Sequence, residues 1–315
     1  MLKFCITLQA LAIAAGLTVA ADLAAHKRTE LVGGVNVWGY RGAVAPQRHP
    51  DELRILVVGG TRAFGWGGAA ENSVPATLYW AVSRSAGQSM LASRQVVSIN
   101  LGAMGRTAAD YAAVLEHYAY LMPDYICIYD DLGRDQTPVP RSRLFRRFGY
   151  ALALPLVVRE KGMALSYGSV EGGYTGVVTG QPSFIHRQSG ALLQAIGQTL
   201  QTLDGLPAER AGGADAEAMI AAITAARRTA KSVVVAVGPA ESDREREDLA
   251  TLASRMNAAI PHDPHVSLLD LSGVAGLTGP GLTLDGYNYN AVGRERVAVA
   301  ISRELIAHIQ RDLAP

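Results

Sequence analysis

The sequence predicts a three-layer α/β/α fold built around a doubly wound, parallel, five-stranded sheet. Five short runs rich in Val and Ile each end near Gly, Asp or Pro, as is typical of strands buried on both faces. Helical patterns separate these runs, and strands that alternate with helices build a parallel sheet covered on both faces. The chain of 315 residues, 49% hydrophobic and 18% charged, is long enough to bury one large core.

The expected strands and helices alternate along most of the chain. Continuous apolar runs predict strands at residues 54–58, 95–101, 124–129, 232–237 and 266–271. Amphipathic patterns predict helices near residues 73–86, 107–121, 190–206, 214–229, 243–259 and 292–313. In the last helix, Val297, Ile301, Leu305 and Ile309 recur every four residues, so one stripe of this helix is expected to be buried.

Residues 4–21 form an almost uninterrupted apolar run behind Lys3. Residues 1–25 are therefore expected to be a signal peptide, with Thr18-Val19-Ala20 as a small-residue cleavage site. A retained membrane anchor is the competing interpretation, because the run is at the lower edge of what crosses a bilayer. The third interpretation is that the run forms an ordinary first helix of the core. Either of the first two makes the protein exported: periplasmic, secreted, or anchored to the membrane and facing outward.

The composition gives no sign of a nucleic-acid partner, a disulfide or a metal site. The formal net charge of +1 gives no global field that would attract nucleic acid, so no nucleic-acid partner is expected. Cys5 lies in an apolar run and Cys127 in an expected strand, so no structural disulfide is expected. His262 and His265 have a spacing that suggests a metal site, but they precede a strand at the amino end of the sheet. No metal or cofactor is expected.

Residues 26–50 are Gly- and Arg-rich and are expected to form a stem before a domain at 51–315, which carries an insertion at about 141–183. Inside the insertion, residues 148–158 are an apolar run flanked by basic residues. A helix of that length reaches only about 16 Å, too short to span a bilayer. It is either an interfacial helix or buried core, so membrane association through residues 4–21 and 148–158 is one alternative. The Gly-rich stretch 168–180 is expected to be a mobile loop.

Ligands of open parallel sheets bind beyond the carboxyl ends of the strands. The loops at that edge are residues 59–67, 102–107, 130–135 and 283–290. They contain Arg62, Arg106 and Arg134, and helix N-termini that also favour anions. One hypothesis is that these arginines bind a carboxylate, sulfate or phosphate group, for example on a glycan. The alternative is that they are ordinary exposed arginines.

Residues 54–67 (RILVVGGTRAFGWG) and 284–293 (LDGYNYNAVG) resemble the first and last signature blocks of the SGNH (GDSL-type) hydrolases. The resemblance covers about residues 36–313. Where that family has Gly-Asp-Ser with the nucleophile, this chain has Gly59-Gly60-Thr61, and where it has Asp-x-x-His, this chain has Asp285 and Asn288. Residues 99–105 resemble the block whose glycine donates to the oxyanion, which places Gly102 there. The third block, 128–135, has no Asn for the family's second donor.

The resemblance implies a flavodoxin-like SGNH fold whose relatives cleave or transfer acyl groups on carbohydrates, lipids or small esters. An amide at position 288 cannot take the proton of a nucleophile. Losing the base removes roughly 10⁶-fold of the rate, about 8 kcal/mol. We therefore expect a catalytically degenerate protein that binds an acylated or anionic carbohydrate, an ester ligand or an envelope partner. The alternatives are an active hydrolase or acyltransferase using Thr61 with a non-standard base such as His186, and a purely structural envelope protein.

The resemblance also assigns the site residues. The degenerate triad positions are Thr61, Asp285 and Asn288, and Gly102 is the oxyanion-hole position. Residues expected to bind the ligand are Gly60, Arg62, Arg106, Asp131, Gly133 and Arg134. For Asp130 and Asp131, an alternative is that they are solvated loop residues or helix caps.

Overall fold

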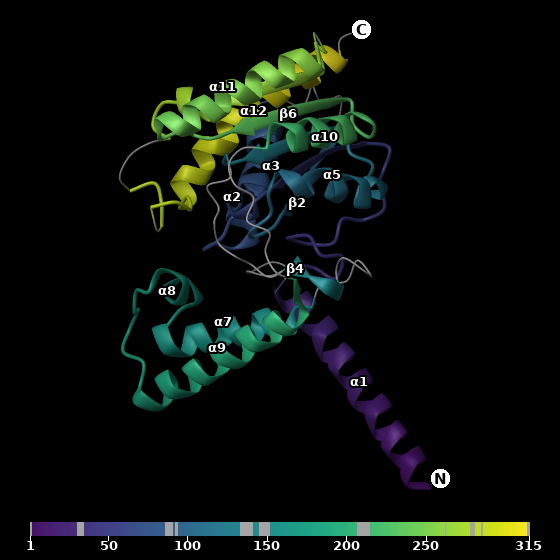
Figure 1. Cartoon of the computed structure of the whole chain (residues 1–315), viewed down its shortest axis with the longest axis vertical. Helices are drawn as coiled ribbons and strands as arrows, with labels where there is room; N and C mark the ends of the chain where they lie inside the picture. The colour runs from purple at the N-terminus through teal and green to yellow at the C-terminus, as the bar shows by residue number, and fades with distance from the viewer. Residues whose placement is uncertain are drawn as a thin grey trace. The chain divides into compact units, whose positions relative to one another are not determined.

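The architecture is that of a computed structural model, which describes residues 2–29, 35–85, 91, 94–132, 141–144, 152–206, 215–261, 263–277, 281–284 and 286–313. The chain divides into two compact units (Figure 1). One unit, called the helical unit, consists of Met1–Val44 and Pro140–Pro207. Ala45–Val139 and Ala208–Pro315 form the other, called the sheet unit.

The sheet unit contains a five-stranded, entirely parallel sheet. Its strands are β1 (Glu52–Gly59), β2 (Gln95–Gly102), β3 (Tyr125–Asp130), β6 (Ser232–Val237) and β7 (Val266–Asp270). The spatial order β2-β1-β3-β6-β7 reverses direction between β1 and β3, which is the point where doubly wound sheets bind ligands. The predicted fold class is confirmed, and each strand lies within one or two residues of its predicted position.

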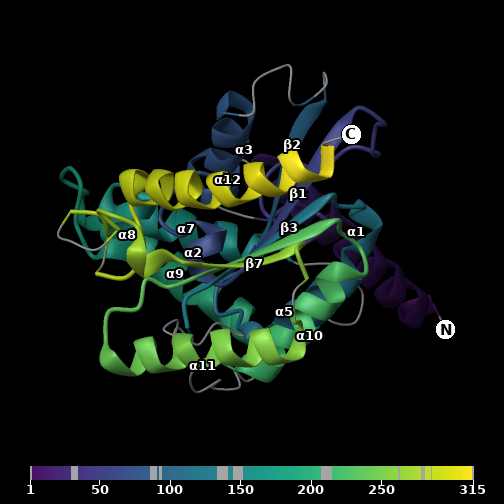
Figure 2. The ribbon, with the colours of Figure 1, turned by 90° about the horizontal axis from the view of Figure 1, so that it is seen from above.

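Helices cover both faces of this sheet (Figure 2). α3 (Val74–Ser85) and α12 (Ala291–Leu313) lie on one face. α5 (Ala108–His117), α10 (Ala216–Arg227) and α11 (Asp243–Ala259) lie on the other. Alternate strand residues form the core on each side, and the predicted stripe of α12 from Val297 to Ile309 is fully buried. Shorter elements are α2 (Thr61–Phe64), η1 (Ala70–Asn72), η2 (Ala119–Leu121) and η3 (Leu271–Gly273).

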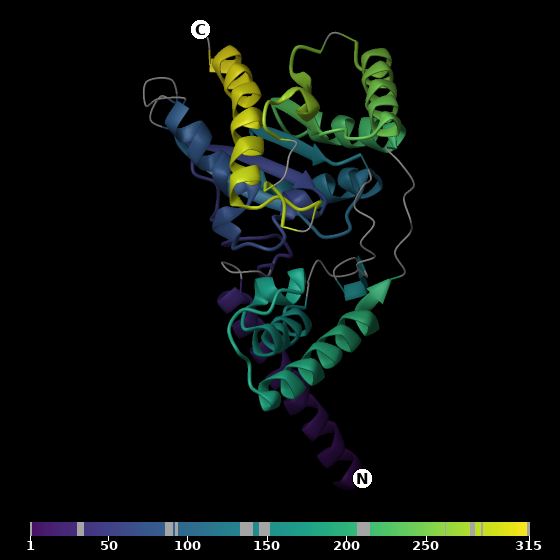
Figure 3. The same ribbon diagram turned by 90° about the vertical axis from the view of Figure 1, so that its left-hand side faces the viewer.

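The helical unit contains α1 (Leu2–Thr29), α7 (Leu154–Tyr167), α8 (Val170–Thr175), α9 (Phe184–Asp204) and the short antiparallel pair β4 (Arg141–Ser142) and β5 (Gly205–Leu206) (Figure 3). α9 packs on α7 through glycines. A Cβ on Gly162 would lie 2.5 Å from the carbonyl oxygen of Gly190, and a Cβ on Gly197 would lie 2.6 Å from the backbone nitrogen of Arg159. Only glycine permits backbones to approach this closely.

This packing corrects two predictions. The helix expected at 190–206 was assigned to the layers around the sheet, whereas α9 belongs to the helical unit. The second segment of the helical unit, Pro140–Pro207, includes the insertion expected at about 141–183. Part of the Gly-rich stretch 168–180 is also more regular than expected. α8 begins there, with the Ser169 hydroxyl accepting a hydrogen bond from the backbone N–H of Gly172 at 2.9 Å.

The N-terminal apolar run lies in α1. A side chain of α1, that of Asp22, caps the N-terminus of α7. The carboxylate of Asp22 accepts the backbone N–H groups of Ala153 at 3.0 Å and Leu154 at 2.8 Å, so it caps the first turn of α7. Of the run at 148–158, residues 148–151 lie outside the described residues, and residues 154–158 begin α7. Among the described residues, no helix has the length and apolar character needed to cross a membrane.

Candidate functional site

The predicted nucleophile position lies at a tight turn from strand to helix at the carboxyl end of β1. A Cβ on Gly59 would collide with the backbone of Tyr129 in the neighbouring strand, so β1 needs glycine at its end. Gly60, in extended conformation, precedes α2, and Gly65 ends it in the left-handed region at φ 80°. Thr61, only 3% exposed, is the first residue of α2. The sequence placed Thr61 and Gly60 at this edge of the sheet, and that is where they lie.

The Thr61 hydroxyl faces the loop that follows β2. Its Oγ1 accepts a hydrogen bond from the backbone N–H of Gly105 at 3.2 Å. Gly105 has φ 67°, a conformation that favours glycine. Sequence reasoning did not single out Gly105, although Gly105 lies within the block that resembles the family's second signature.

Gly102 has a different role from the predicted one. Its backbone N–H donates to the Asn100 side-chain oxygen at 2.8 Å, and the Asn100 amide in turn donates to the carbonyl oxygen of Phe64 at 3.2 Å. A Cβ on Gly102 would collide with the backbone of α2. Glycine is therefore required for close packing, and the N–H expected to serve an oxyanion is bonded to Asn100. The signal available in the sequence was an Asn near the end of a largely apolar strand, two residues before the glycine.

Arg62 is buried, with 4% of its surface exposed. Its Nε and Nη2 atoms donate to the backbone carbonyl oxygen of Tyr287 at 3.1 and 2.8 Å. The guanidinium carbon lies 4.4 Å from the ring centroid of Tyr287 and 4.7 Å from that of Tyr289, within cation–π range of both. Arg62 therefore joins the first block to the last, and its burial excludes the alternative that it is an ordinary exposed arginine.

Arg294 makes a second connection between the same blocks and was not predicted. It is a buried residue of α12 whose guanidinium donates to the carbonyl oxygens of Trp66 and, at 3.4 Å, of Asn72. A Cβ on Gly68 would collide with this guanidinium, so the loop after α2 passes directly over it. The sequence did carry a signal: Arg294 precedes Val297 by three residues and so continues the buried stripe of α12.

The predicted base position, Asn288, lies in the loop before α12 and is 7% exposed. Its backbone carbonyl oxygen accepts the N–H of Leu284 at 2.7 Å across a turn in which Gly286 has φ 84°. Asn288 follows Tyr287, the residue held by Arg62, and Thr61 precedes Arg62. The structure thus brings these two segments side by side. The third triad position, Asp285, lies outside the described residues.

Asp130, the last residue of β3, and Asp131, which follows it, are buried, which corrects the idea that they are solvated. Asp130 accepts the Tyr111 hydroxyl at 2.7 Å and the backbone N–H of Leu132 at 2.8 Å. Burial raises the pKa of Asp130, and these two hydrogen bonds work in the opposite direction. Leu132 has φ 60°, a conformation that is costly for a residue with a side chain. Gly133 and Arg134 lie outside the described residues.

The hypothesised cluster of three arginines is not assembled as expected. Arg106 is half-buried and donates to the backbone carbonyl oxygen of Leu101. Arg62 is buried against two tyrosines, and Arg134 cannot be placed. Both described arginines therefore bind backbone oxygens within the fold, so neither is a free cation at the rim.

Two buried donors of this site have no acceptor among the described residues: Nη1 of Arg62 and the hydroxyl of Tyr129. Burial raises the pKa of Tyr129 well above its usual range, against the opposing effect of the Arg62 charge, so the phenol stays protonated at neutral pH. A buried donor without an acceptor costs about 1–3 kcal/mol. Two such donors in one site favour an acceptor that is not among the described residues.

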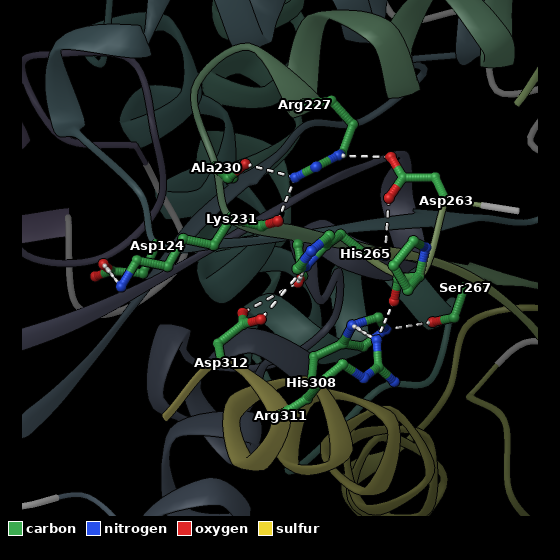
Figure 4. Close-up of polar contacts among 12 residues, drawn as sticks. Asp124, Arg227, Ala230, Lys231, Asp263, His265, Ser267, His308, Arg311 and Asp312 are labelled. Carbon is green, nitrogen blue, oxygen red and sulfur yellow. Dashed lines mark hydrogen bonds and ion pairs between the residues drawn. The ribbon is translucent and has the colours of Figure 1, made fainter. Parts of the chain in front are cut away.

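Within the sheet unit, the described histidines provide no base beside Thr61. His186, the replacement considered above, is an exposed residue of α9 in the helical unit. His265 and His308 lie at the amino ends of the strands, the edge opposite Thr61 (Figure 4). His262 lies outside the described residues. No set of three or more His, Cys, Asp or Glu side chains in the described ranges is arranged to hold a metal ion.

His265 belongs to a Ser, His and Asp cluster that does not have the geometry of a catalytic triad. Its Nδ1 atom lies 3.3 Å from Asp312 and 3.2 Å from the Ser232 hydroxyl, whereas a triad uses one ring nitrogen for each partner. Ser232 is fully buried and its hydroxyl also lies 3.2 Å from the Asp312 carboxylate. The cluster ties β6, the start of β7 and the end of α12 together.

The sequence matches no family model and no curated protein. The solved structures to which it is similar include two hydrolases. LAE5, an α/β hydrolase from the metagenome of Lake Arreo, Spain, shares 14% identity at a TM-score of 0.42, covering 82% of this chain and 96% of that one. AlinE4, an SGNH-hydrolase family esterase, shares 15% identity at a TM-score of 0.35, covering 82% of this chain and 97% of that one. At this identity the similarity concerns the fold alone.

Proposed function

We propose that this protein is a catalytically degenerate SGNH-hydrolase-like protein that binds a ligand through a carboxylate or an acyl carbonyl group. The ligand would be an acylated or anionic carbohydrate, or a small ester. The binding groups are Nη1 of Arg62 and the hydroxyl of Tyr129, at the point where the sheet order reverses. The observation that carries the proposal is that both are buried donors without an acceptor among the described residues.

The chemistry of position 288 supports binding over catalysis. An amide accepts and donates hydrogen bonds but does not take up a proton at neutral pH. The guanidinium of Arg62, bonded to the preceding residue Tyr287, is always protonated in proteins and cannot act as a base either. The hydrogen bond from Gly105 uses Thr61 Oγ1 as an acceptor, whereas a nucleophile needs a base that accepts its own proton.

The same groups suit an oxygen ligand. A guanidinium and a neutral phenol both donate, and a carboxylate or ester carbonyl offers the lone pairs that they lack. Charge-assisted hydrogen bonds in a water-excluded site are about twice as strong as neutral ones. The acyl-carbohydrate class comes from the resemblance of residues 54–67 and 284–293 to the signature blocks of hydrolases that act on such groups.

The proposal is tested by removing a single donor that has no part in the fold. In the Tyr129→Phe variant, calorimetric affinity for acetate, uronic acid oligosaccharides or O-acetylated glycans should fall by about tenfold, the value of one buried hydrogen bond. The stability of the ligand-free protein should not fall, because the lost hydroxyl has no acceptor to leave behind. The Tyr79→Phe variant, on α3, is the matched control and should bind normally. Equal affinity in wild type and Tyr129→Phe for every ligand of the panel would contradict the proposal.

A second candidate function is ester hydrolysis or acyl transfer by Thr61 with a non-standard base. One observation favours it: Thr61 lies at the strand-to-helix turn and its Oγ1 is within hydrogen-bond distance of a backbone N–H. The rate of p-nitrophenyl acetate hydrolysis by wild type and by Thr61→Ala separates the two candidate functions.

A further inference from the structure

α9 has an apolar face exposed to solvent. Its opposite side packs on α7 through Gly190 and Gly197, and the Gln194 amide donates to the Ser166 hydroxyl at 2.9 Å. The exposed aliphatic residues of α9 are Ile185 (72%), Leu192 (62%), Ile196 (42%), Leu200 (39%) and Leu203 (71%). Spacings of seven, four, four and three residues place all five along one face. This apolar stripe is about 27 Å long at the rise of an α-helix.

The same unit contains a helix that is apolar on all sides. α1 has no charged residue from Phe4 to Ala21, and exposed positions include Ile6, Ile13, Leu17 and Val19. In both Figure 1 and Figure 3, the N-terminal part of α1 runs clear of α7 and α9. A helix that is hydrophobic all round requires an apolar environment on every side. Two separate elements of the helical unit therefore expose apolar surface.

The charge of the chain is divided unequally between its two units. The residues of the helical unit include eleven Lys and Arg against five Asp and Glu, a net charge of +6. The sheet unit has eighteen against twenty-three, a net charge of −5. The total of +1 hides this difference. Basic charge in the unit with the exposed apolar surface is complementary to anionic headgroups, each basic residue near such a surface contributing about 1 kcal/mol.

We propose that the helical unit docks on the surface of an anionic phospholipid bilayer, with the apolar stripe of α9 in the boundary between headgroups and acyl chains. An interfacial helix lies in the plane of the membrane, with its apolar face buried about 5–10 Å deep. This replaces residues 148–158 as the interfacial segment. The proposal is independent of the ligand site, which is built from the sheet unit.

The depth of α9 is measured with tryptophan in the full-length protein. Vesicles contain phosphatidylglycerol and phosphatidylcholine brominated on the acyl chains, which quench tryptophan at that depth. The Leu192→Trp variant should lose most of the emission that it adds to the wild-type signal from Trp38, Trp66 and Trp80. The Gln198→Trp variant, on the side of α9 away from the stripe, is the matched control and should keep its added emission.

The Ile185→Trp variant tests the other end of the stripe and should be quenched like Leu192→Trp. Quenching of both should decrease in vesicles of phosphatidylcholine alone, and in about 0.5 M salt, where the Debye length shrinks to a few ångströms. If both variants are quenched no more than Gln198→Trp, the stripe is covered by something else, such as a second copy of the chain, and the proposal is wrong. Equal quenching in neutral and anionic vesicles would overturn its electrostatic part.

Discussion

The guanidinium of Arg62 donates two hydrogen bonds to the backbone carbonyl oxygen of Tyr287, 225 positions further along the chain. This contact joins the residue after the nucleophile position to the residue before the base position. A permanently charged, buried group thus connects the two segments. The guanidinium also lies within cation–π range of the rings of Tyr287 and Tyr289, and these contacts help to fix the loop before α12.

Replacing Arg62 should destabilise the sheet unit. The Arg62→Met variant loses both hydrogen bonds and the contacts with Tyr287 and Tyr289, and leaves a buried carbonyl oxygen without its donors. We expect its free energy of unfolding in urea to fall by about 3 kcal/mol. Arg244→Met, an exposed residue of α11, is the control and should change stability by no more than about 0.5 kcal/mol. A loss for Arg62→Met as small as that of the control would mean that the contact is not formed in solution.

Gly68 and Arg294 should be energetically coupled. Gly68→Ala places a methyl group on the Arg294 guanidinium, which must move and lose its bonds to Trp66 and Asn72. In an Arg294→Met background the same methyl group displaces no charged hydrogen-bond donor. The destabilisation caused by Gly68→Ala should therefore be smaller there, by at least about 1 kcal/mol. Additive effects in a double-mutant cycle of urea unfolding would contradict this packing.

His308 should make stability depend on pH below about 6.5, its ordinary pKa. Burial and the nearby Arg311 guanidinium lower the pKa of His308, with Asp312 acting in the opposite direction and His265 and Arg227 adding to the lowering. Above pH 6.5 the imidazole is neutral in both states and contributes nothing. As the pH falls below 6.5, the unfolded chain binds the proton first, so folded stability is lost until the lowered pKa is reached.

The measurement for His308 is urea unfolding at several pH values between 7.5 and about 5, in wild type and in His308→Gln. Glutamine retains a donor toward Ser267, to which His308 Nε2 is bonded at 3.0 Å, but does not titrate. The stability of wild type relative to the variant should decrease as the pH falls through this range. A difference that stays constant, or increases toward acid, would show that the imidazole is not held neutral in the fold.

The sheet could be predicted from sequence because buried parallel strands are continuous apolar runs. Ser232–Val237 and Asp243–Ala259 have the predicted bounds, since a run between polar ends and a capping box define them locally. The partner of a helix is not encoded so locally. The pattern near residues 190–206 predicted a helix, but its packing on α7 depends on Gly162, Gly190 and Gly197 meeting in three dimensions.

The candidate site was predictable to the level of segments but not of side-chain direction. Thr61 begins α2 and Asn288 lies in the loop before α12, and the contact between Arg62 and Tyr287 brings these two segments together. The direction of Arg62 toward Tyr287, and the capture of the Gly102 N–H by Asn100, depend on contacts between segments distant in sequence. Glycine spacing indicates a turn in both cases, but it does not say which polar group each N–H or guanidinium will meet.

The central proposal is that this site resembles that of a serine esterase but has an amide, Asn288, at the position of the family's proton-accepting histidine. The most direct test is the hydrolysis of p-nitrophenyl acetate by wild type and by Thr61→Ala, purified in parallel. The account predicts that both proteins show the same rate, no faster than background hydrolysis on an inert protein surface. Turnover by wild type near the usual enzymic value of about 10 s⁻¹, abolished in Thr61→Ala, would contradict it.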